Sequence, residues 1–267
     1  MAPESGVRDA EFLVALDVSG NPQSNPQSAI RNPQFATVRL ASRVAREWLT
    51  PTASELVHRY DKSSGRVRAA LVDRYDALVL SERPAAADPE IAARLLADAW
   101  LERGPGADDI QLLRRLRFAG QAADIEGMVR ASAYGVRSLD EVRVERALTP
   151  DTLRGLERDA PISLVVPSGR HAALEYQEDG SVSASVKLQE LFGLAETPRV
   201  GRQREPVVLA LLAPNGRPVQ VTRDLRSFWD RTYPEVRKEL RGRYPKHPWP
   251  EDPWTAPPTA RTKKRHG

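Results

Sequence analysis

The sequence predicts an α+β protein. We expect a β-rich first part, a helical middle segment, a small α+β domain with two β-hairpins and helices, and a Pro-rich basic tail. Short alternating runs occupy residues 11–84, apolar residues then recur at helical spacing, and after residue 160 two turn sequences separate further alternating runs. These changes of pattern place the boundaries at residues 1–87, 88–159, 160–250 and 251–267.

The first part has the pattern of a small β-barrel or sandwich. A helical stretch at Ser42–Trp48 is expected between strands, and Asn21–Gln34 contains three Asn-Pro-Gln copies that predict a loop without chemistry, because each proline removes a backbone donor. Five short strands with intervening turns favour an OB-like arrangement. The expected strands are Phe12–Val18, Phe35–Leu40, Leu56–Tyr60, Arg66–Val72 and Ala77–Leu80.

The middle segment is predicted to be helical. Asp88 as a cap and Pro89 at the first position begin a helix that Gly104 ends. A second helix carries three arginines whose spacing favours a solvated face over phosphate contact; they are Arg114, Arg115 and Arg117. Shorter helices are expected at Asp124–Ser132, Ser138–Arg146 and Pro150–Arg158.

The domain at 160–250 is predicted from its turns. Asp179-Gly180 and the segment Pro214–Arg217 predict two hairpins. Two helical stretches, Asp224–Arg231 and Pro234–Arg243, follow, with Thr232 and Glu235 spaced as a capping box. The expected core-facing residues of these helices are Leu225, Phe228, Trp229, Val236 and Leu240.

Composition excludes several classes of site. The 267 residues contain no cysteine and four histidines, and no two histidines lie three or four residues apart, so neither a disulfide nor a His-based metal site is expected. There is no apolar run of about 18 residues and no secretory signal pattern, so we expect no membrane partner and a cytoplasmic location.

Positive charge is concentrated near the C-terminus. Residues 199–267 contain 16 Lys and Arg against 7 Asp and Glu, whereas the whole chain has 40 against 36. A local positive field is what a polyanion requires. The alternative is that the basic residues only keep the chain soluble.

Motifs for nucleotide chemistry are missing from the sequence. It contains no GxxxxGK[ST], no DExH or DExD box, no GxGxxG and no HExxH. We therefore expect no catalytic residue, no metal ligand and no cofactor in this chain.

The segment 237–249 is the candidate for nucleic-acid binding. Its cations are able to neutralise phosphates, and its two aromatic residues, which lie between prolines, are able to stack on bases. The alternative for these aromatic residues is that they pack the proline-rich chain onto the domain. The candidate residues are Arg237, Lys238, Arg241, Arg243, Tyr244, Lys246, His247 and Trp249.

Several long strings resemble a known family. Within about 161–259 the sequence closely resembles the C-terminal region of HrpB-type bacterial ATP-dependent helicases, which are DEAH-box-like RNA helicases of superfamily 2. The strings that carry the resemblance are VPSGRHAALEYQEDGSVSASVKLQELFGLAETPRVG, which contains KLQELFGL, and PVVLALLAPNGRPVQVTRDLRSFWDRTYPEVRKELRGRYPKHPWPEDPWTAPPT. Residues 11–84 resemble the OB-type domain that precedes this region in the family. The strings that carry this resemblance are FLVALDVSG, ATVRLAS and RVRAALVDRYDALVLSERP, whereas the Asn-Pro-Gln insert departs from the family's pattern.

The resemblance implies an accessory role. The family's two RecA-like domains, its P-loop, its Asp-Glu-x-His box and its arginine motifs match nothing in the sequence, so ATP and Mg²⁺ are expected only for motor domains outside this chain. We expect either an excised fragment or a protein whose motor is encoded elsewhere. It would bind single-stranded RNA or DNA and support the RecA-like domains. The alternative is a protein–protein docking module whose basic surface contacts an acidic partner or the ribosome.

Overall fold

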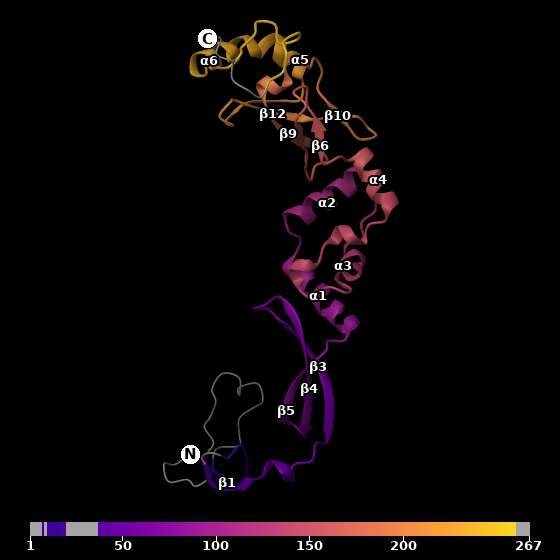
Figure 1. Cartoon of the computed structure of the whole chain (residues 1–267), viewed down its shortest axis with the longest axis vertical. Helices are drawn as coiled ribbons and strands as arrows, with labels where there is room; N and C mark the ends of the chain where they lie inside the picture. The colour runs from indigo at the N-terminus through magenta and orange to yellow at the C-terminus, as the bar shows by residue number, and fades with distance from the viewer. Residues whose placement is uncertain (1–6, 8–9, 20–36, 260–267) are drawn as a thin grey trace, which may run out of the picture. The chain divides into compact units, whose positions relative to one another are not determined.

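The computed structural model describes residue 7 and residues 10–19 and 37–259. The chain forms two compact units, Met1–Ala92 and Ala93–Gly267 (Figure 1). The predicted loop at residues 21–34 and the basic end at residues 260–267 lie outside the described residues.

Unit 1 is built from two separate antiparallel sheets. One pairs β1 with β2, and the other has the order β3-β4-β5. A 3₁₀ turn, Arg46–Trp48, lies between β2 and β3. The strands are β1 (Phe12–Ser19), β2 (Thr37–Val44), β3 (Ala53–Asp61), β4 (Arg66–Tyr75) and β5 (Leu78–Ala85). The β-rich character is confirmed, and the OB-type arrangement stays a prediction.

The helix predicted at Ser42–Trp48 is wrong over its first half. Ser42 pairs with Val14 and Val44 with Phe12, so the strand β2 continues to Val44. Cross-strand pairing with β1 overrides the local helical preference, and only the last three residues form a turn of helix.

Unit 1 leaves much of its apolar surface exposed. Its buried apolar residues are Ala69, Val72 and Leu80. Small sheets of two or three strands need packing on one face for independent stability. The exposed large apolar residues of this unit are Leu13, Val14, Leu16, Leu40, Trp48, Leu56, Tyr75, Leu78 and Val79.

The helical segment begins and ends as predicted at its caps. Oδ1 of Asp88 accepts hydrogen bonds from the backbone N–H groups of Glu90 and Ile91, and Gly104 has a φ of 81° at the end of the helix. The helix predicted at Ser138–Arg146 is instead two 3₁₀ turns, Leu139–Glu141 and Val144–Ala147. The α-helices are α1 (Pro89–Arg103), α2 (Ala107–Phe118), α3 (Ile125–Ala133) and α4 (Pro150–Asp159).

The rest of unit 2 contains a four-stranded sheet with the order β13-β12-β9-β8. The predicted hairpins β8–β9 and β12–β13 are confirmed, and β12 also runs parallel to β9, which joins the two hairpins into one sheet. Two short antiparallel pairs, β6–β7 and β10–β11, lie beside it. The strands are β6 (Ser163–Val165), β7 (His171–Ala173), β8 (Glu175–Tyr176), β9 (Val182–Lys187), β10 (Arg199–Val200), β11 (Glu205–Pro206), β12 (Val208–Leu212) and β13 (Pro218–Thr222).

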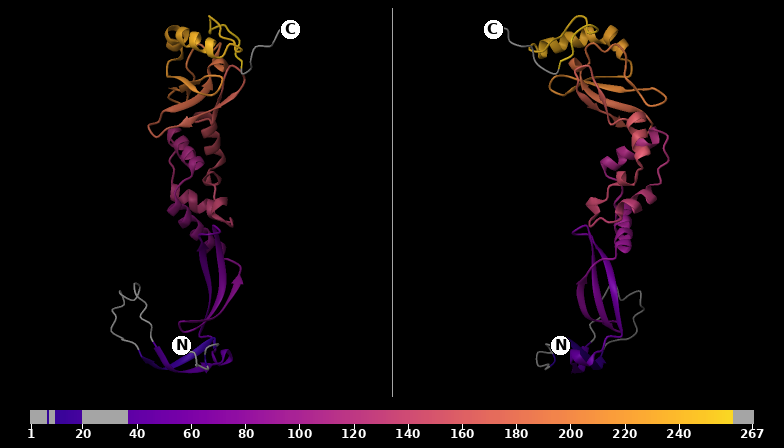
Figure 2. Two further views of the ribbon diagram at one scale, coloured as in Figure 1. Left: turned by 90° about the vertical axis from the view of Figure 1, so that its left-hand side faces the viewer. Right: turned by 45° about the vertical axis from the view of Figure 1, so that its right-hand side comes forward.

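The C-terminal helices are continuous, so the predicted capping box is wrong. Helix α5 (Leu225–Ser227) runs through a π-helical turn, Phe228–Thr232, into α6 (Tyr233–Arg243). Thr232 already has helical dihedral angles, and its side chain makes no capping hydrogen bond. Figures 1 and 2 show α6 at one end of unit 2 and α1 at the other.

Helix α2 is hydrogen-bonded to the C-terminal part of unit 2. The Gln111 side chain accepts from the N–H of Tyr176 at 2.9 Å and donates to its carbonyl oxygen at 3.2 Å. Arg114 donates to the same carbonyl, and Nε of Arg115 donates to the carbonyl of Ala160 at 2.9 Å. The solvated-face prediction is therefore wrong for these two arginines, because backbone acceptors of the next domain lie against them, whereas Arg117 is exposed.

Gly201 permits a close approach between α2 and the β10–β11 hairpin. It has a φ of 76°, and a Cβ at this position would lie 2.6 Å from Cε1 of Phe118. Gly135 has the same φ, with nothing within 4 Å of a Cβ. Alanine at Gly135 would therefore introduce backbone strain alone, whereas alanine at Gly201 would introduce the same strain and a steric overlap with Phe118.

We expect Gly201→Ala to destabilise unit 2 more than Gly135→Ala. The left-handed backbone costs about 1–2 kcal/mol for either alanine, and overpacking against Phe118 adds about 1–3 kcal/mol at residue 201. Urea denaturation measures both free energies of unfolding. Equal losses in the two variants would contradict the close contact.

Candidate nucleic-acid interface

An aromatic cluster supports the segment that follows the sheet. Trp229 lies at its centre, with ring centroids 5.0 Å from Phe228, 5.2 Å from Tyr233 and 6.0 Å from Phe192. All four rings are buried, and Nε1 of Trp229 donates to the carbonyl of Leu194 at 2.8 Å. The cluster fixes α5, the π-helical turn and the start of α6 as one rigid support.

Residues 244–259, called the strap here, pack on this support without regular secondary structure. The indole of Trp249 is only 7% exposed, and its Nε1 donates to the carbonyl of Tyr244 at 2.9 Å. The hydroxyl of Tyr233 donates to the carbonyl of Pro250, and Nε of Arg237 donates to that of Trp249. Side chains thus satisfy strap carbonyls that no helix or sheet would satisfy.

Further contacts hold the strap along its length. The Gln189 side chain donates to the carbonyl of Pro248, and its backbone carbonyl accepts from Thr259. The N–H of Gly193 donates to Pro253. Arg237 also forms an ion pair with Glu251 at 2.8 Å. The strap therefore lies on the domain up to residue 259.

The structure divides the eight predicted residues into two groups. Half of them are directed into the packing: Trp249 is buried, and Arg237, Tyr244 and His247 are half-buried. The other half are exposed. These exposed basic residues are Lys238, Arg241, Arg243 and Lys246.

The surroundings of His247 disfavour its cationic form. Burial, and secondarily the charge of Lys187, lower the pKa of His247 below its usual value. Its Nδ1 is buried, and no hydrogen-bond partner for it is recorded among the described residues. Arg237 is paired with Glu251, so the positive charge that the segment displays comes from the exposed residues, of which Arg243 is paired with Glu239 at 3.2 Å.

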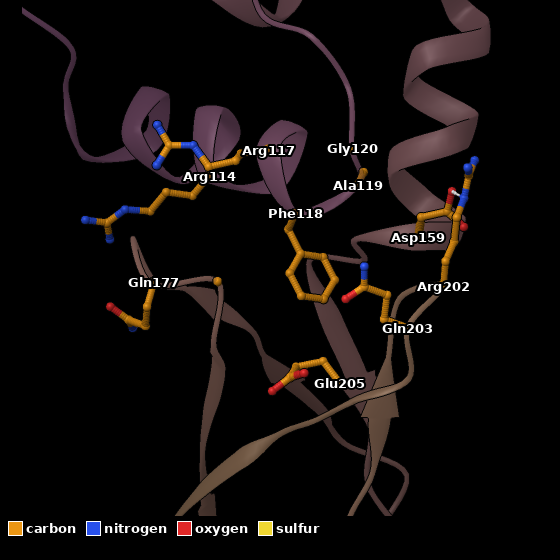
Figure 3. A pocket seen from close by; sticks show the side chains of 11 residues that line it. Arg114, Arg117, Phe118, Ala119, Gly120, Asp159, Gln177, Arg202, Gln203 and Glu205 are labelled. Atoms are coloured by element: carbon orange, nitrogen blue, oxygen red, sulfur yellow. Dashed lines mark hydrogen bonds and ion pairs between the residues drawn. The ribbon is translucent and has the colours of Figure 1, made fainter.

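Unit 2 also contains a polar cleft of about 370 Å³ that the sequence did not predict (Figure 3). It lies between the end of α2, the β8–β9 turn and the β10–β11 hairpin. Helix α2 contributes Arg114, Arg117 and Phe118, and Figure 3 shows the phenyl ring pointing away from the helix toward Glu205. The lining is completed by Ala119, Gly120, Asp159, Gln177, Gly180, Arg202, Gln203 and Glu205.

Asp159 fixes one wall of this cleft. Its carboxylate is 6% exposed and accepts from Nε and a terminal nitrogen of Arg158 and from Nε of Arg202, at 2.8–2.9 Å. Hydrogen bonds from Arg158 and Arg202 lower the pKa of Asp159 to about 2. The ion pair joins the end of α4 to the tip of the β10–β11 hairpin. No sequence signal indicates it, because the partners lie 43 residues apart.

The described part of the chain contains neither a cluster of metal ligands nor a membrane-spanning helix. Within residues 10–19 and 37–259, no group of three or more His, Cys, Asp or Glu residues is arranged to hold a metal ion. Among the helices in these ranges, none is both long and apolar enough to span a bilayer.

Comparisons with known proteins support the resemblance seen in the sequence. Residues 125–253 match the family model described as ATP-dependent helicase C-terminal, HrpB_C. The chain is 41% identical over 179 residues to the ATP-dependent RNA helicase HrpB of Escherichia coli K12. This chain contains the C-terminal region of an HrpB-type helicase. The match with the family begins at residue 125 and therefore includes α3 and α4, which the quoted strings did not cover.

The fold agrees with a solved HrpB structure. The crystal structure of the E. coli DExH-box NTPase HrpB aligns with a TM-score of 0.58 and 27% identity over 97% of this chain. This chain covers 35% of that crystallised chain, and its sequence match covers 22% of the curated E. coli protein. Residues 125–253, which match the family model, include the four-stranded sheet, the strap up to residue 253 and the cleft residues from Asp159 to Glu205.

We expect Trp249→Ala to lower the free energy of unfolding by about 3–5 kcal/mol, because it removes a buried indole and leaves a cavity under the strap. Trp48→Ala is the matched control, since Trp48 is 71% exposed, and it should change stability by no more than about 0.5 kcal/mol. Chemical denaturation measures both. A small loss for Trp249→Ala would mean that the indole does not hold the strap.

The Asp159 ion pair predicts an acid-dependent stability. The pKa of Asp159 lies below its usual 3.8, so the carboxylate stabilises the fold above about pH 4, and this stabilisation is lost as the pH falls toward 2. Asp159→Asn should therefore lower the thermal midpoint by several degrees at pH 7 and by much less near pH 2. Asp230→Asn, an exposed control, should change neither value. An equal deficit at both pH values would exclude the ion pair as the cause.

Proposed function

We propose that this chain is the accessory C-terminal part of an HrpB-type ATP-dependent RNA helicase. It binds single-stranded nucleic acid, RNA in preference to DNA, and supports RecA-like motor domains. ATP and Mg²⁺ bind to those motor domains and not to this chain, whose sequence has no P-loop. Hydrolysis of ATP by the motor would drive strand separation while this part holds the strand.

The exposed basic residues carry the proposal for nucleic-acid binding. Lys238, Arg241, Arg243 and Lys246 lie within nine residues and are all exposed, next to a strap that is fixed by buried side chains. Cations on a rigid support lose little conformational freedom when they contact phosphates, and counterion release makes such contacts favourable at low salt. Trp249 contributes by packing the strap rather than by stacking on a base.

The apolar surface of unit 1 supports a docking role. Side chains such as Leu16, Leu40 and Trp48 are more than half exposed. A surface of this kind marks an interaction site. We propose that it packs against the motor domains, which correspond to the part of the E. coli relative that this chain does not cover. Contact with the motor domains would then bury this apolar surface and stabilise unit 1.

The nucleic-acid proposal is tested by charge reversal. We expect Arg241→Glu combined with Lys246→Glu to weaken binding of a labelled single-stranded RNA by at least about tenfold at low salt, because two phosphate contacts are replaced by repulsion. Fluorescence anisotropy measures the dissociation constants. The effect should be similar for RNAs of different sequence, since phosphate contacts carry no base information.

Arg94→Glu is the control for net charge. Arg94 is exposed on α1, at the other end of unit 2 from α6 (Figure 1). A single change at Arg94 should weaken binding only slightly. If the double variant retains the wild-type affinity, the basic segment does not bind RNA. An acidic protein partner or the ribosome would then be the remaining occupant of this surface.

A further inference from the structure

We infer that the cleft between α2 and the β10–β11 hairpin binds one unstacked nucleotide of a single strand, with a base that carries an amino group. The inference rests on the proposed nucleic-acid binding and adds a second, base-selective site to it. The cleft volume of about 370 Å³ is within the range of small-ligand sites and suits one nucleotide rather than a duplex.

The arginines of the cleft are oriented and still have free donors. Arg114 uses one terminal nitrogen on the carbonyl of Tyr176, and Arg202 uses Nε on Asp159. Each guanidinium has five N–H donors, so several remain for a phosphate. The side chain of Arg117 is exposed, and no partner for it is recorded within residues 37–259. These groups offer donors that a phosphate diester would accept.

The cleft also contains groups that suit a base. Phe118 is half-buried, held edge-on to Tyr176 with ring centroids 5.1 Å apart, and lines the cleft. An aromatic ring provides a stacking surface for any base. Gln203 offers an amide donor and acceptor beside the ring, and Gln177 lines the cleft from the β8–β9 turn (Figure 3). The combination of guanidinium, ring and amide groups is that of a nucleotide site rather than of an apolar docking groove.

Glu205 makes the site selective. Its half-buried carboxylate lines the cleft, and among the described residues it has no recorded side-chain partner. A carboxylate accepts hydrogen bonds, as from N4 of cytosine, whereas it repels O4 of uracil, which occupies the same position on the base and offers only lone pairs. Glu205 therefore favours a base with an amino group at this position over uracil.

The test compares binding of labelled oligocytidine and oligouridine of 12 nucleotides by fluorescence anisotropy. We expect the wild-type chain to bind oligocytidine more tightly, and Glu205→Gln to reduce this preference at least threefold. Arg117→Glu should weaken both oligonucleotides about tenfold, with Arg94→Glu as the control. Both cleft residues are at least partly exposed, and thermal unfolding checks that the variants fold.

Each other outcome overturns the inference. A base preference that Glu205→Gln leaves unchanged excludes the cleft as its source. Equal weakening by Arg117→Glu and Arg94→Glu indicates a general charge effect. Competition by cytidine monophosphate as effective as that by the oligonucleotide would mean that the occupant is a free nucleotide.

These experiments distinguish the hypothesis that the basic segment binds RNA from the hypothesis that the cleft does. If Arg241→Glu with Lys246→Glu has no effect while Arg117→Glu weakens binding, the cleft binds the strand and the basic segment does not. If the reverse holds, the proposed function stands and the cleft inference is overturned.

Discussion

Burial of the Trp249 indole under the strap is the contact on which the basic segment depends. Prolines prevent residues 245–258 from forming a helix or a sheet, so their backbone carbonyls need partners elsewhere. Tyr233 and Arg237 supply two of these partners from their side chains, and Trp249 supplies one for the carbonyl of Tyr244 at the start of the strap. The chain between these contacts is held at the surface. The exposed cations of the segment are therefore displayed on an ordered backbone rather than on a free tail.

A second constraint shapes the cleft. Four segments distant in sequence meet there: the end of α2, the end of α4, the β8–β9 turn and the tip of the β10–β11 hairpin. Gly201 allows Phe118 to approach the hairpin, and Asp159 binds two arginines that would otherwise repel each other. Because Arg202 keeps N–H donors beyond its contact with Asp159, the same ion pair stabilises the fold and leaves unused donors at the cleft.

Local signals predicted the features that depend on neighbouring residues. The Asp88 cap, the Asp179-Gly180 turn and the strand alternation after it were all found, since each is determined within a few residues. The parallel pairing of β9 with β12 and the contacts of Arg114 and Arg115 were missed because the partners lie far along the chain. In the candidate site, the sequence revealed the charges. The sequence did not determine whether Trp249 is buried, because a tryptophan between prolines is compatible with an indole packed onto the domain and with an exposed indole that stacks on a base.

The central claim is that this chain, without a motor, binds a single strand through phosphate contacts. The most direct measurement is the dissociation constant of the wild-type chain for a single-stranded RNA at several salt concentrations between roughly 50 and 200 mM. Phosphate contacts weaken measurably over this range of salt concentration. Four phosphate contacts predict a slope of about −3 in log association constant against log salt, from about −0.7 per contact. A slope near zero, or no binding at the lowest salt, would contradict the account.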